Sequence, residues 1–416
     1  MQVKTILNAI EKHPGFVYEQ VKFVERNGGK CIEVQIRSRR KSKGKCSGCK
    51  QAKPGYDKLP ERSFQFVPLW GIAVYFLYAL RRVNCLECGI GAEEVPWALG
   101  KRPVTESFAW FLSTWAKRLS WSEVSVIFDT SWESVFRSVE MAVLWGRARI
   151  NLSGITAIGV DEIYWKRGKF MTLVYQINDG CMRLLWVGEE RREKTLNGFF
   201  DWFGKERSEL IKFVCSDMWK PYLNVIAERA KNALNILDRF HIAAKMNKAL
   251  DEVRAEETRS IKHKDTEPVL KNSRWCLLKR PENLTETQEV KLKDLLKCNL
   301  KTIRAYLLKE EFQFFWSYLS PTWAAKFMDL WCKKAMRSRI DPMKKIARMI
   351  RSHKPLILNW FKAKGQLSLG AVEGMNNKLK ASIRKSYGFR TSYALKTMLY
   401  HKLGQLPTPE GTHEFC

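Results

Sequence analysis

The chain has 416 residues, and its 73 Lys and Arg outnumber its 43 Asp and Glu to give a formal net charge of +30. At 45% hydrophobic and 12% aromatic residues, it holds enough apolar side chains for folded cores, which excludes a disordered basic chain. A folded protein this basic repels itself unless it binds a polyanion, so nucleic acid is the first candidate partner and an anionic membrane the second. The length predicts roughly two to four domains.

The sequence gives no sign of a membrane span. The longest uncharged stretch, 63–80, is interrupted by Pro68 and Gly71, and its β-branched and aromatic residues fit two strands of a hairpin better. The N-terminus lacks the continuous apolar run of a signal peptide. Eleven cysteines, an odd number, argue against a secreted disulfide framework. We therefore expect a soluble protein of a reducing compartment.

Residues 1–100 are expected to form short strands. The segments 16–25 and 30–38 flank the sequence Asn27-Gly28-Gly29, which predicts a hairpin. Between Arg37 and Lys58 there are nine Lys or Arg and one acid, a density that resists burial and suits phosphate. A merely solvated loop is an alternative of about equal weight. The residues predicted to contact DNA here are Arg39, Arg40, Lys41, Lys43 and Lys45.

Two CxxC pairs lie in this first segment, Cys46 with Cys49 and Cys85 with Cys88. Four thiolates at tetrahedral corners are the usual ligand set of a structural zinc ion, and a hairpin over 63–82 would bring the pairs together. The alternative is four free thiols or a redox pair, which the paired spacing disfavours. The sequence therefore predicts one structural Zn²⁺ in a small β-rich module.

Residues 101–150 change to helical spacing. Apolar residues recur on one face of 106–119, the segment 120–123 has the pattern of a capping box, and a turn at 129–131 precedes a third helix. Helix, short helix, turn and helix form a helix-turn-helix outline, in which Ser134 and Arg137 would begin the recognition helix and read bases. Short amphipathic helix pairs are also common elsewhere, so the outline alone does not decide the function.

Residues 151–240 alternate between strands and helices. Three strands (155–161, 169–177 and 181–188) are followed by a helix, a strand, a helix and a last strand, which predicts a mixed α/β sheet. The chain is then helical to its end, with a break near Gly388. The predicted domains are a zinc-binding β-rich module at 1–100, a helix-turn-helix module at 101–150, a catalytic core at 151–240 and 370–403, and an all-helical insertion at 241–369.

Acidic residues are expected at one edge of this sheet. Asp161 and Asp217 end two apolar strands, and the carboxyl ends of neighbouring strands converge where α/β proteins place their sites. Two-metal phosphoryl chemistry needs such a cluster, because Mg²⁺ prefers carboxylate oxygens and two ions roughly 4 Å apart clamp the reacting oxygens. A third acid could come from Glu373, in a helix that also presents Asn377, Lys380 and Arg384 on one face to DNA phosphate. A single strand-end Asp is more often a cap or turn residue, and Glu162 should point to the opposite face.

Five segments make the pattern specific. They are GVDEIYWKRG (159–168), VCSDMWKPYLNVI (214–226), LDRFHIAAKMNKALDEVR (237–254), SRWCLLKRPENLT (273–285) and VEGMNNKLKASIRKSYGFR (372–390). In this order they resemble the bacterial insertion-sequence transposases of the ISL-three family, over essentially the whole chain. The resemblance implies an RNase H-like core with a DDE triad of Asp161, Asp217 and Glu373 that holds two Mg²⁺ ions, with Mn²⁺ as a possible substitute. It also implies a zinc module and a helix-turn-helix that bind DNA.

The function expected from the residues and the resemblance is DNA transposition. The protein would bind the terminal inverted repeats of its element, cleave a strand and join it to target DNA, as a dimer or larger assembly in the bacterial cytoplasm at the nucleoid. Two alternatives remain: a zinc and helix-turn-helix DNA-binding regulator without catalysis, and a structure-selective nuclease of RNase H type. A metal-dependent nicking assay on DNA that carries the element ends (end DNA) distinguishes the transposase from the regulator. Joining of the cleaved strand to another DNA distinguishes the transposase from the nuclease.

Three further features have two interpretations each. The segment Asp238-Arg239-Phe240-His241 looks like a (C/D)xxH signature of such transposases, so His241 is expected to assist catalysis, with a core histidine as the alternative. Trp275 is expected in a core, in preference to stacking on a DNA base. The run 326–364 holds twelve Lys or Arg against two Asp and is interpreted as DNA contact, with a solvated helix face as the alternative.

Overall fold

The computed structural model describes residues 2–26, 28–166, 168–262, 269–363, 371–386 and 388–412, with the backbone alone at Lys262, Ala371 and Glu373. The chain divides into two compact units, Met1–Asn151 with Lys378–Cys416, and Leu152–Asn377. Each unit has a hydrophobic core of its own.

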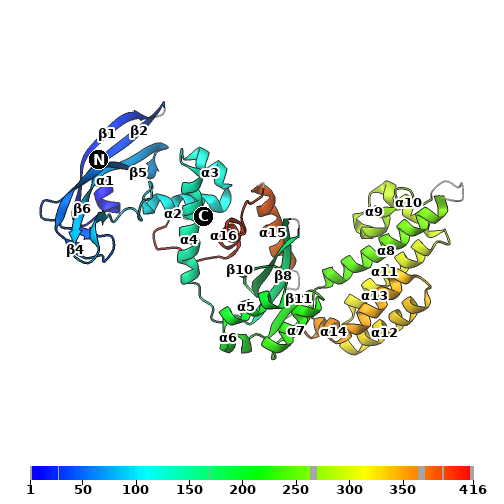
Figure 1. The fold of residues 1–416 in the computed structure, drawn as a ribbon. Coiled ribbons are helices and arrows are strands. Elements are labelled where there is room, and N and C mark those ends of the chain that lie inside the picture. Colours follow the sequence, from blue (N-terminus) through cyan, green and yellow to red (C-terminus); the bar gives the residue numbers. More distant parts are fainter. Residues whose placement is uncertain are drawn as a thin grey trace. The chain divides into compact units, whose positions relative to one another are not determined.

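The first unit begins with a β-rich module (Figure 1). Its elements are α1 (Val3–Ile10), β1 (Phe16–Arg26), β2 (Gly29–Ser38), β3 (Gly44–Cys46), β4 (Ala52–Lys53), β5 (Gly55–Leu69), β6 (Ile72–Cys85) and β7 (Gly89–Glu94). They form one sheet of order β1-β2-β6-β7-β3-β4, and β5 also pairs with β6. The predicted β1–β2 hairpin and the predicted hairpin over 63–80 are confirmed. Helix α1 is not among the predicted elements.

The long hairpin of β5 and β6 supplies much of the core of this module. Its two-residue turn has positive φ at both positions, 52° at Trp70 and 79° at Gly71, as a type I′ turn requires. Along β6, buried and partly exposed residues alternate, which is typical of a sheet with one covered face. The buried residues of β6 in the core are Val74, Phe76, Tyr78 and Leu80, and Trp97 joins them.

Four helices complete the first unit. They are α2 (Glu106–Arg118), α3 (Trp121–Ile127), α4 (Trp132–Ala148) and α16 (Ser392–Leu403), and α16 packs against α4. Helices α2, α3 and α4 each begin after a hydroxyl residue (Thr105, Ser120 or Ser131) whose side chain accepts a hydrogen bond from the backbone N–H three residues on. Ser120 and Glu123 form the predicted capping box. The order of helices and turn matches the predicted outline.

The second unit contains a five-stranded sheet. Its strands are β8 (Ala157–Lys166), β9 (Lys169–Asn178), β10 (Cys181–Glu189), β11 (Phe213–Ser216) and β12 (Leu234–Leu237), in the order β10-β9-β8-β11-β12. Strands β10, β9 and β8 are antiparallel, whereas β8, β11 and β12 run parallel. The mixed sheet predicted from the sequence is therefore present. The connecting helices are α5 (Glu193–Phe203), α6 (Lys205–Glu209) and α7 (Lys220–Arg229).

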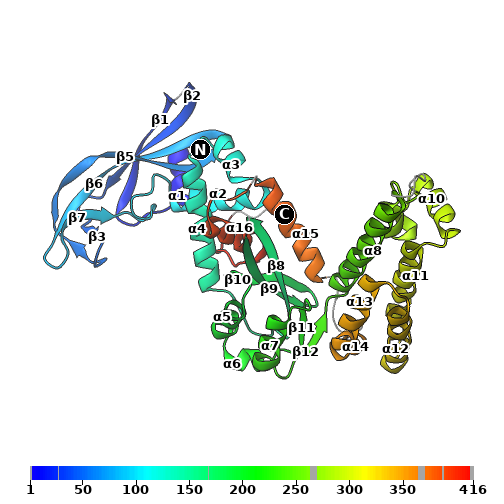
Figure 2. The same ribbon diagram turned by 45° about the vertical axis from the view of Figure 1, so that its right-hand side comes forward.

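The two faces of β8 meet different helices. Ile158 and Val160 belong to a core that includes apolar residues of α5 and α7, the helices near this sheet in Figure 2. Successive strand residues alternate, so Gly159 and Asp161 face the other side. There the first turns of α15 (Ala371–Lys385) approach closely, because a Cβ on Gly159 would lie only 2.5 Å from Cγ2 of Val372. Glycine at 159 therefore permits this close packing.

The rest of the second unit is helical in the described residues, as predicted. The elements are α8 (Arg239–Lys262), α9 (Arg274–Leu278), η1 (Pro281–Asn283), α10 (Glu286–Leu296), α11 (Lys301–Gln313), η2 (Phe314–Ser317), α12 (Pro321–Arg337), α13 (Asp341–Ser352) and α14 (Lys354–Ala363). The last of these helices returns to the sheet. Asn359 of α14 donates a hydrogen bond of 2.7 Å to the backbone oxygen of Asn235 in β12.

Candidate active site and cysteine cluster

Asp161 lies inside β8 and not at its end, which corrects the prediction from sequence. The strand continues to Lys166 because β9 pairs with it over this length, including the pair of Asp161 with Leu173. The parallel neighbour β11 pairs with β8 only over 157–159. Asp161 therefore lies just beyond the part of β8 that has a strand on both sides, at the carboxyl edge of the parallel strands.

The carboxylate of Asp161 is held at both oxygens. The side chain is buried, with 9% of its residue surface exposed. Oδ1 accepts a 2.7 Å hydrogen bond from the backbone N–H of Glu162, and Oδ2 accepts one from Nδ2 of Asn376. Burial raises the pKa of Asp161, although these two hydrogen bonds and nearby His241 lower it. A cation bound beside Asp161 would therefore stabilise the ionised form of its carboxylate.

Asp217 directly follows β11. Its Oδ1 accepts a hydrogen bond of 2.9 Å from the backbone N–H of Trp219, and its Oδ2 lies 3.0 Å from Nη2 of Arg191. The same guanidinium forms an ion pair with Glu162 and lies 4.4 Å from the centre of the Trp219 ring. Burial raises the pKa of Glu162 to about 7, because the neighbouring Asp217 and Asp161 offset the effect of Arg191. Glu162 and Asp161 contact different partners, as expected for side chains on opposite faces.

His241 lies near the same edge, in the first turn of α8. Its Nε2 is 3.8 Å from Oδ2 of Asp238 and 4.0 Å from Oδ1 of Asp161. Asp238 directly follows β12, and its Oδ1 accepts a 2.8 Å hydrogen bond from the N–H of Phe240. The imidazole side chain is 37% exposed, so it is not a core histidine. Its predicted catalytic role stays a prediction.

Glu373 belongs to α15, but its side chain lies outside the described residues. The residues one position before it and three positions after it on that helix contact the sheet. Val372 packs against Gly159, and Asn376 bonds Asp161 and accepts a 3.0 Å hydrogen bond from the hydroxyl of Tyr175. The backbone of α15 at Glu373 therefore lies between two residues that touch the β8 region. The triad of Asp161, Asp217 and Glu373 itself stays a prediction.

The residues at this edge fit a divalent magnesium ion by their chemistry. They offer carboxylate oxygens, which are the ligands that Mg²⁺ and Mn²⁺ prefer. The carboxylates raise one another's pKa, as Asp217 does for both Asp161 and Glu162, so a cation among them would be stabilising. The guanidinium of Arg191 and the imidazole of His241 lie beside these carboxylates.

The four cysteines form a cluster in the first unit. The Sγ atoms of Cys46, Cys49, Cys85 and Cys88 all lie within 4.8 Å of one another, and this is the one group of at least three metal-capable side chains found among the described residues. The backbone N–H groups of Cys49 and Gly48 lower the pKa of Cys46 to about 7, which favours its thiolate, whereas desolvation and the neighbouring thiols raise the pKa of Cys88. Four sulfurs are compatible with a structural zinc ion and leave no open position for catalysis.

A buried ion pair connects the sheet to the basic loop. The carboxylate of Glu93, whose side chain is fully buried, accepts hydrogen bonds from Nε and Nη2 of Arg81 and a 2.7 Å bond from the hydroxyl of Tyr78. Nη1 of Arg81 donates to the backbone oxygen of Ser42 at 2.6 Å. Sequence reasoning missed this pair, although an acid in a short strand after a CxxC motif could have prompted a search for a buried partner.

The predicted DNA-contact residues differ from one another in how exposed they are. Those of the basic loop and its strand are all exposed, and so are three on α15. These exposed residues are Arg39, Arg40, Lys41, Lys43, Lys45, Asn377, Lys380 and Arg384. Ser134 is buried, with 8% exposed, and its hydroxyl is 2.9 Å from that of the N-cap residue Ser131. This position does not suit base reading.

Arg137 is accessible on α4, with half of its side chain exposed. It pairs with Glu133 at 3.7 Å and with Glu140 at 3.0 Å, one turn on either side. Glu140 is in turn bonded by the hydroxyl of Tyr393 at 2.6 Å. To contact DNA, Arg137 would have to leave both carboxylates. The pair with Glu133, which is 72% exposed, contributes little stability, whereas Glu140 is only 12% exposed and that pair costs more to break.

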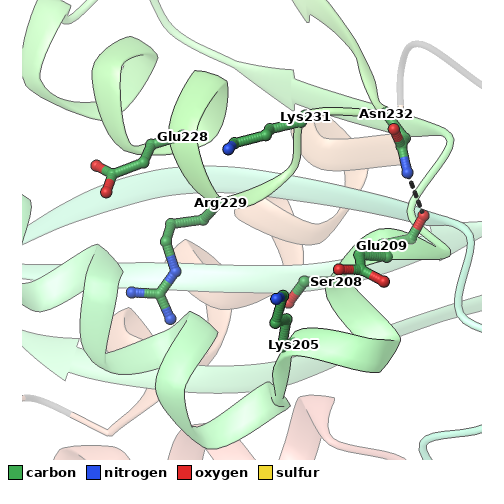
Figure 3. A pocket seen from close by; sticks show the side chains of 7 residues that line it. All are labelled: Lys205, Ser208, Glu209, Glu228, Arg229, Lys231 and Asn232. Atoms are coloured by element: carbon green, nitrogen blue, oxygen red, sulfur yellow. Dashed lines mark hydrogen bonds between the residues drawn. The ribbon is translucent and has the colours of Figure 1, made fainter.

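Two other features of the second unit bear on the predictions. Trp275 is 56% exposed beside Arg274, so the expectation of a core tryptophan is wrong. A polar pocket of about 490 Å³ is lined by residues of α6, α7 and the segment that precedes β12, including Lys205, Arg229 and Asn232 (Figure 3). Because α6 precedes β11 and this segment precedes β12, the pocket is at the opposite edge of the sheet from Asp217 and Asp238.

Comparison with known proteins identifies the class. Residues 158–399 match a family model described as transposase, for DDE transposases of the ISL-three type. The chain belongs to this family, as the sequence motifs predicted. The transposase for insertion sequence element IS1557 of Mycobacterium tuberculosis is 30% identical, with 95% of each chain covered. The transposase for IS1001 of Bordetella parapertussis is 26% identical, over 93% of this chain and 95% of its own. No helix within the described residues is long and apolar enough to span a membrane.

Proposed function

We propose that this transposase binds the terminal inverted repeats of an insertion sequence and catalyses metal-dependent DNA cleavage and strand transfer. The observation that carries the proposal is the position of Asp161 and Asp217. Both lie at the carboxyl edge of neighbouring parallel strands, close enough that the charge of Asp217 raises the pKa of Asp161. Membership of the transposase family supports DNA as the substrate.

We propose that the five-stranded sheet is the RNase H-like core that the family resemblance implies. Asp161, Asp217 and Glu373 would hold two Mg²⁺ or Mn²⁺ ions. When bound, such ions supply Lewis-acid stabilisation of the attacking and leaving oxygens in phosphoryl transfer. The packing of Val372 against Gly159 and the bond from Asn376 to Asp161 support a position for Glu373 near the other two acids.

Residues of the chain itself would bind and orient the DNA strand at this edge. His241 would hold or move a proton beside the reacting phosphate, a role supported by its 37% exposure and its distance of 4.0 Å from Asp161. Arg191 forms ion pairs with Asp217 and Glu162 and so balances their charge. Lys380 and Arg384 are exposed on α15 and would neutralise DNA phosphates.

End recognition is assigned to the first 150 residues. The exposed cations of the basic loop, from Arg39 to Lys45, can contact phosphates but cannot distinguish bases by charge alone. Arg137 on α4 can reach base edges in the major groove, where Arg forms bidentate bonds with guanine. The cysteine cluster would bind one Zn²⁺ and fold the module around it. Two ends must be held at once, so we propose a dimer or a larger assembly that acts on DNA in the bacterial cytoplasm.

The test uses purified full-length protein and a labelled duplex that carries the inverted repeats found in the DNA flanking the gene. Asp161→Asn, Asp217→Asn and Glu373→Gln should each reduce Mg²⁺-dependent nicking and strand joining to background while end binding is retained. Asp179→Asn is the control, because this exposed acid lies in the β9–β10 turn at the other end of β9. Nicking that persists in all three variants would refute the assignment.

The same assay separates the two alternative functions. End binding without any metal-dependent nicking by the wild-type protein would favour a zinc and helix-turn-helix regulator. Nicking of branched or hybrid substrates without end preference and without joining would favour a structure-selective nuclease. Joining of a cleaved 3′ end to a second duplex distinguishes the transposase from both.

A further inference from the structure

Asn376 connects the acid of β8 to a buried tyrosine of β9. Its Nδ2 donates a hydrogen bond to Oδ2 of Asp161, and its Oδ1 accepts a hydrogen bond of 3.0 Å from the hydroxyl of Tyr175. Tyr175 has no exposed surface, and Asp161 has 9% exposed. Asn376 therefore uses both ends of its side-chain amide on residues that lie 201 and 215 positions away in the chain.

The direction of each hydrogen bond in this chain of three residues is fixed. A phenol is protonated at neutral pH, and burial raises the pKa of Tyr175 further, so its hydroxyl can donate. Because Oδ1 of Asn376 accepts that proton, the NH₂ group must face Asp161. A flipped amide would place two acceptor oxygens against each other and leave the buried hydroxyl without its acceptor.

The consequence for Asp161 is a fixed carboxylate plane. Oδ1 is held by the backbone N–H of Glu162 at 2.7 Å, and Oδ2 is held by Asn376. Each carboxylate oxygen has two lone pairs, so one on each oxygen stays available for another partner after these bonds form. A carboxylate that is held in this way does not need to be reoriented when a cation binds to it.

We propose that Asn376 is a positioning residue that orients Asp161 for the divalent metal, and that Tyr175 acts through Asn376 by setting the orientation of its amide. The inference rests on the proposed metal-dependent function of Asp161. Residues that orient metal ligands typically change metal affinity by roughly 10–100-fold when they are removed. The hydrogen bond that Tyr175 makes at this site goes to Asn376, so its hydroxyl acts on the orientation of Asp161 through the amide.

The experiment measures metal binding directly. Mn²⁺ is titrated into the full-length chain and free Mn²⁺ is followed by electron paramagnetic resonance, alongside the Mg²⁺ dependence of nicking on end DNA. Asn376→Ala should weaken Mn²⁺ binding by roughly 10–100-fold, and Tyr175→Phe by a smaller factor in the same direction. In both variants the Mg²⁺ concentration for half-maximal nicking should rise, while the rate at saturating Mg²⁺ changes little.

The double variant provides the sharpest comparison. If Tyr175 acts only through Asn376, Tyr175→Phe should have no further effect on Mn²⁺ affinity in the Asn376→Ala background. Tyr222→Phe is the matched control, because this buried hydroxyl lies 2.6 Å from Thr172 and forms no hydrogen bond with Asn376. Additive effects of the two changes, or an Mn²⁺ affinity in both single variants equal to that of Tyr222→Phe, would overturn the inference.

The outcomes also separate this inference from the proposed function. Asp161→Asn should reduce Mn²⁺ binding whatever Asn376 does. If Asp161→Asn leaves Mn²⁺ binding intact, the metal site itself is wrong. If Asp161→Asn weakens binding but Asn376→Ala does not, the metal site stands and the positioning role of Asn376 is refuted.

Discussion

Gly159→Ala tests whether the close approach of α15 to β8 assembles the site. A Cβ at this position would lie 2.5 Å from Cγ2 of Val372 and 3.5 Å from Cγ2 of Ile177. Non-bonded carbon atoms in contact lie roughly 3.5–4.0 Å apart, so Val372 and its helix must retreat by about 1 Å. Overpacking of this size in a core costs about 1–3 kcal/mol of stability. The glycine has no positive φ, so the backbone itself tolerates alanine.

The assay combines thermal unfolding with nicking of end DNA. In a unit of this size, each kcal/mol lowers the unfolding temperature by roughly 2–4 °C. Nicking should fall further, because a displacement of about 1 Å at a catalytic site can reduce the rate by roughly 100-fold. Replacing Val372 by Ala in the Gly159→Ala chain removes the clashing methyl group. The double variant should regain part of the lost unfolding temperature and part of the lost nicking rate.

Gly198→Ala provides the comparison. This glycine lies in α5 of the same unit, and a Cβ there would meet only Cζ2 of Trp186 at 3.7 Å, an ordinary contact distance. It should be neutral or slightly stabilising, because alanine favours a helix over glycine by about 1 kcal/mol. If Gly159→Ala matches Gly198→Ala in unfolding temperature and in nicking, the close packing of α15 on β8 is not needed, and the reasoning fails.

Three other predictions concern the first unit. Purified protein should contain about one zinc per chain by elemental analysis, and Cys46→Ser should lose the metal and end binding, whereas Cys31→Ala, outside the cluster, should keep both. Burial and nearby Lys117 and Lys402 lower the pKa of His401 to about 3, so the unfolded chain binds the proton first as the pH falls below the ordinary value near 6.5. The free energy of unfolding should therefore lose nothing from His401 above that pH, and should fall by about 1.4 kcal/mol per pH unit between that pH and about pH 3. In the His401→Leu variant, the free energy of unfolding should not show this loss. Binding of end DNA should weaken steeply with salt; in competition assays Arg137→Ala should mainly lose the preference for ends over random DNA, and Lys380→Ala should weaken both equally.

Features that depend on neighbouring residues could be predicted from the sequence. The β1–β2 and β5–β6 hairpins follow from glycine-containing turns between apolar strands, and the capping box at Ser120 follows from two residues three positions apart. The pairing of the cysteines needed only their spacing and one hairpin. In the hairpins and the capping box, the interacting residues lie close together in the sequence, and the cysteine cluster needs only one such hairpin to join its two pairs.

Features set by tertiary contacts could not be predicted. Nothing near Asp161 indicates that Asn376, 215 positions away, bonds its carboxylate, or that β9 extends β8 beyond it. Ser134 has the expected place on its helix, but it lies on the buried face, with 8% exposed and its hydroxyl 2.9 Å from that of Ser131. Trp275 is apolar in a short helix that buries only Cys276 and Leu277, so it remains exposed. Helical spacing identifies a helix more reliably than it identifies which apolar side chains find a partner.

Substitutions on and beneath α15 separate the position of the helix from the chemistry of its acid. Glu373→Gln removes a charge but keeps a residue of similar helix propensity, so it should leave the unfolding temperature unchanged while it abolishes nicking. Gly159→Ala should lower both, because it displaces the helix. Asn376→Ala should shift the Mg²⁺ requirement and leave the rate at saturating Mg²⁺ nearly unchanged. If Glu373→Gln instead lowered the unfolding temperature as much as Gly159→Ala, its loss of nicking would reflect the fold, and the third carboxylate of the triad would have to be sought elsewhere.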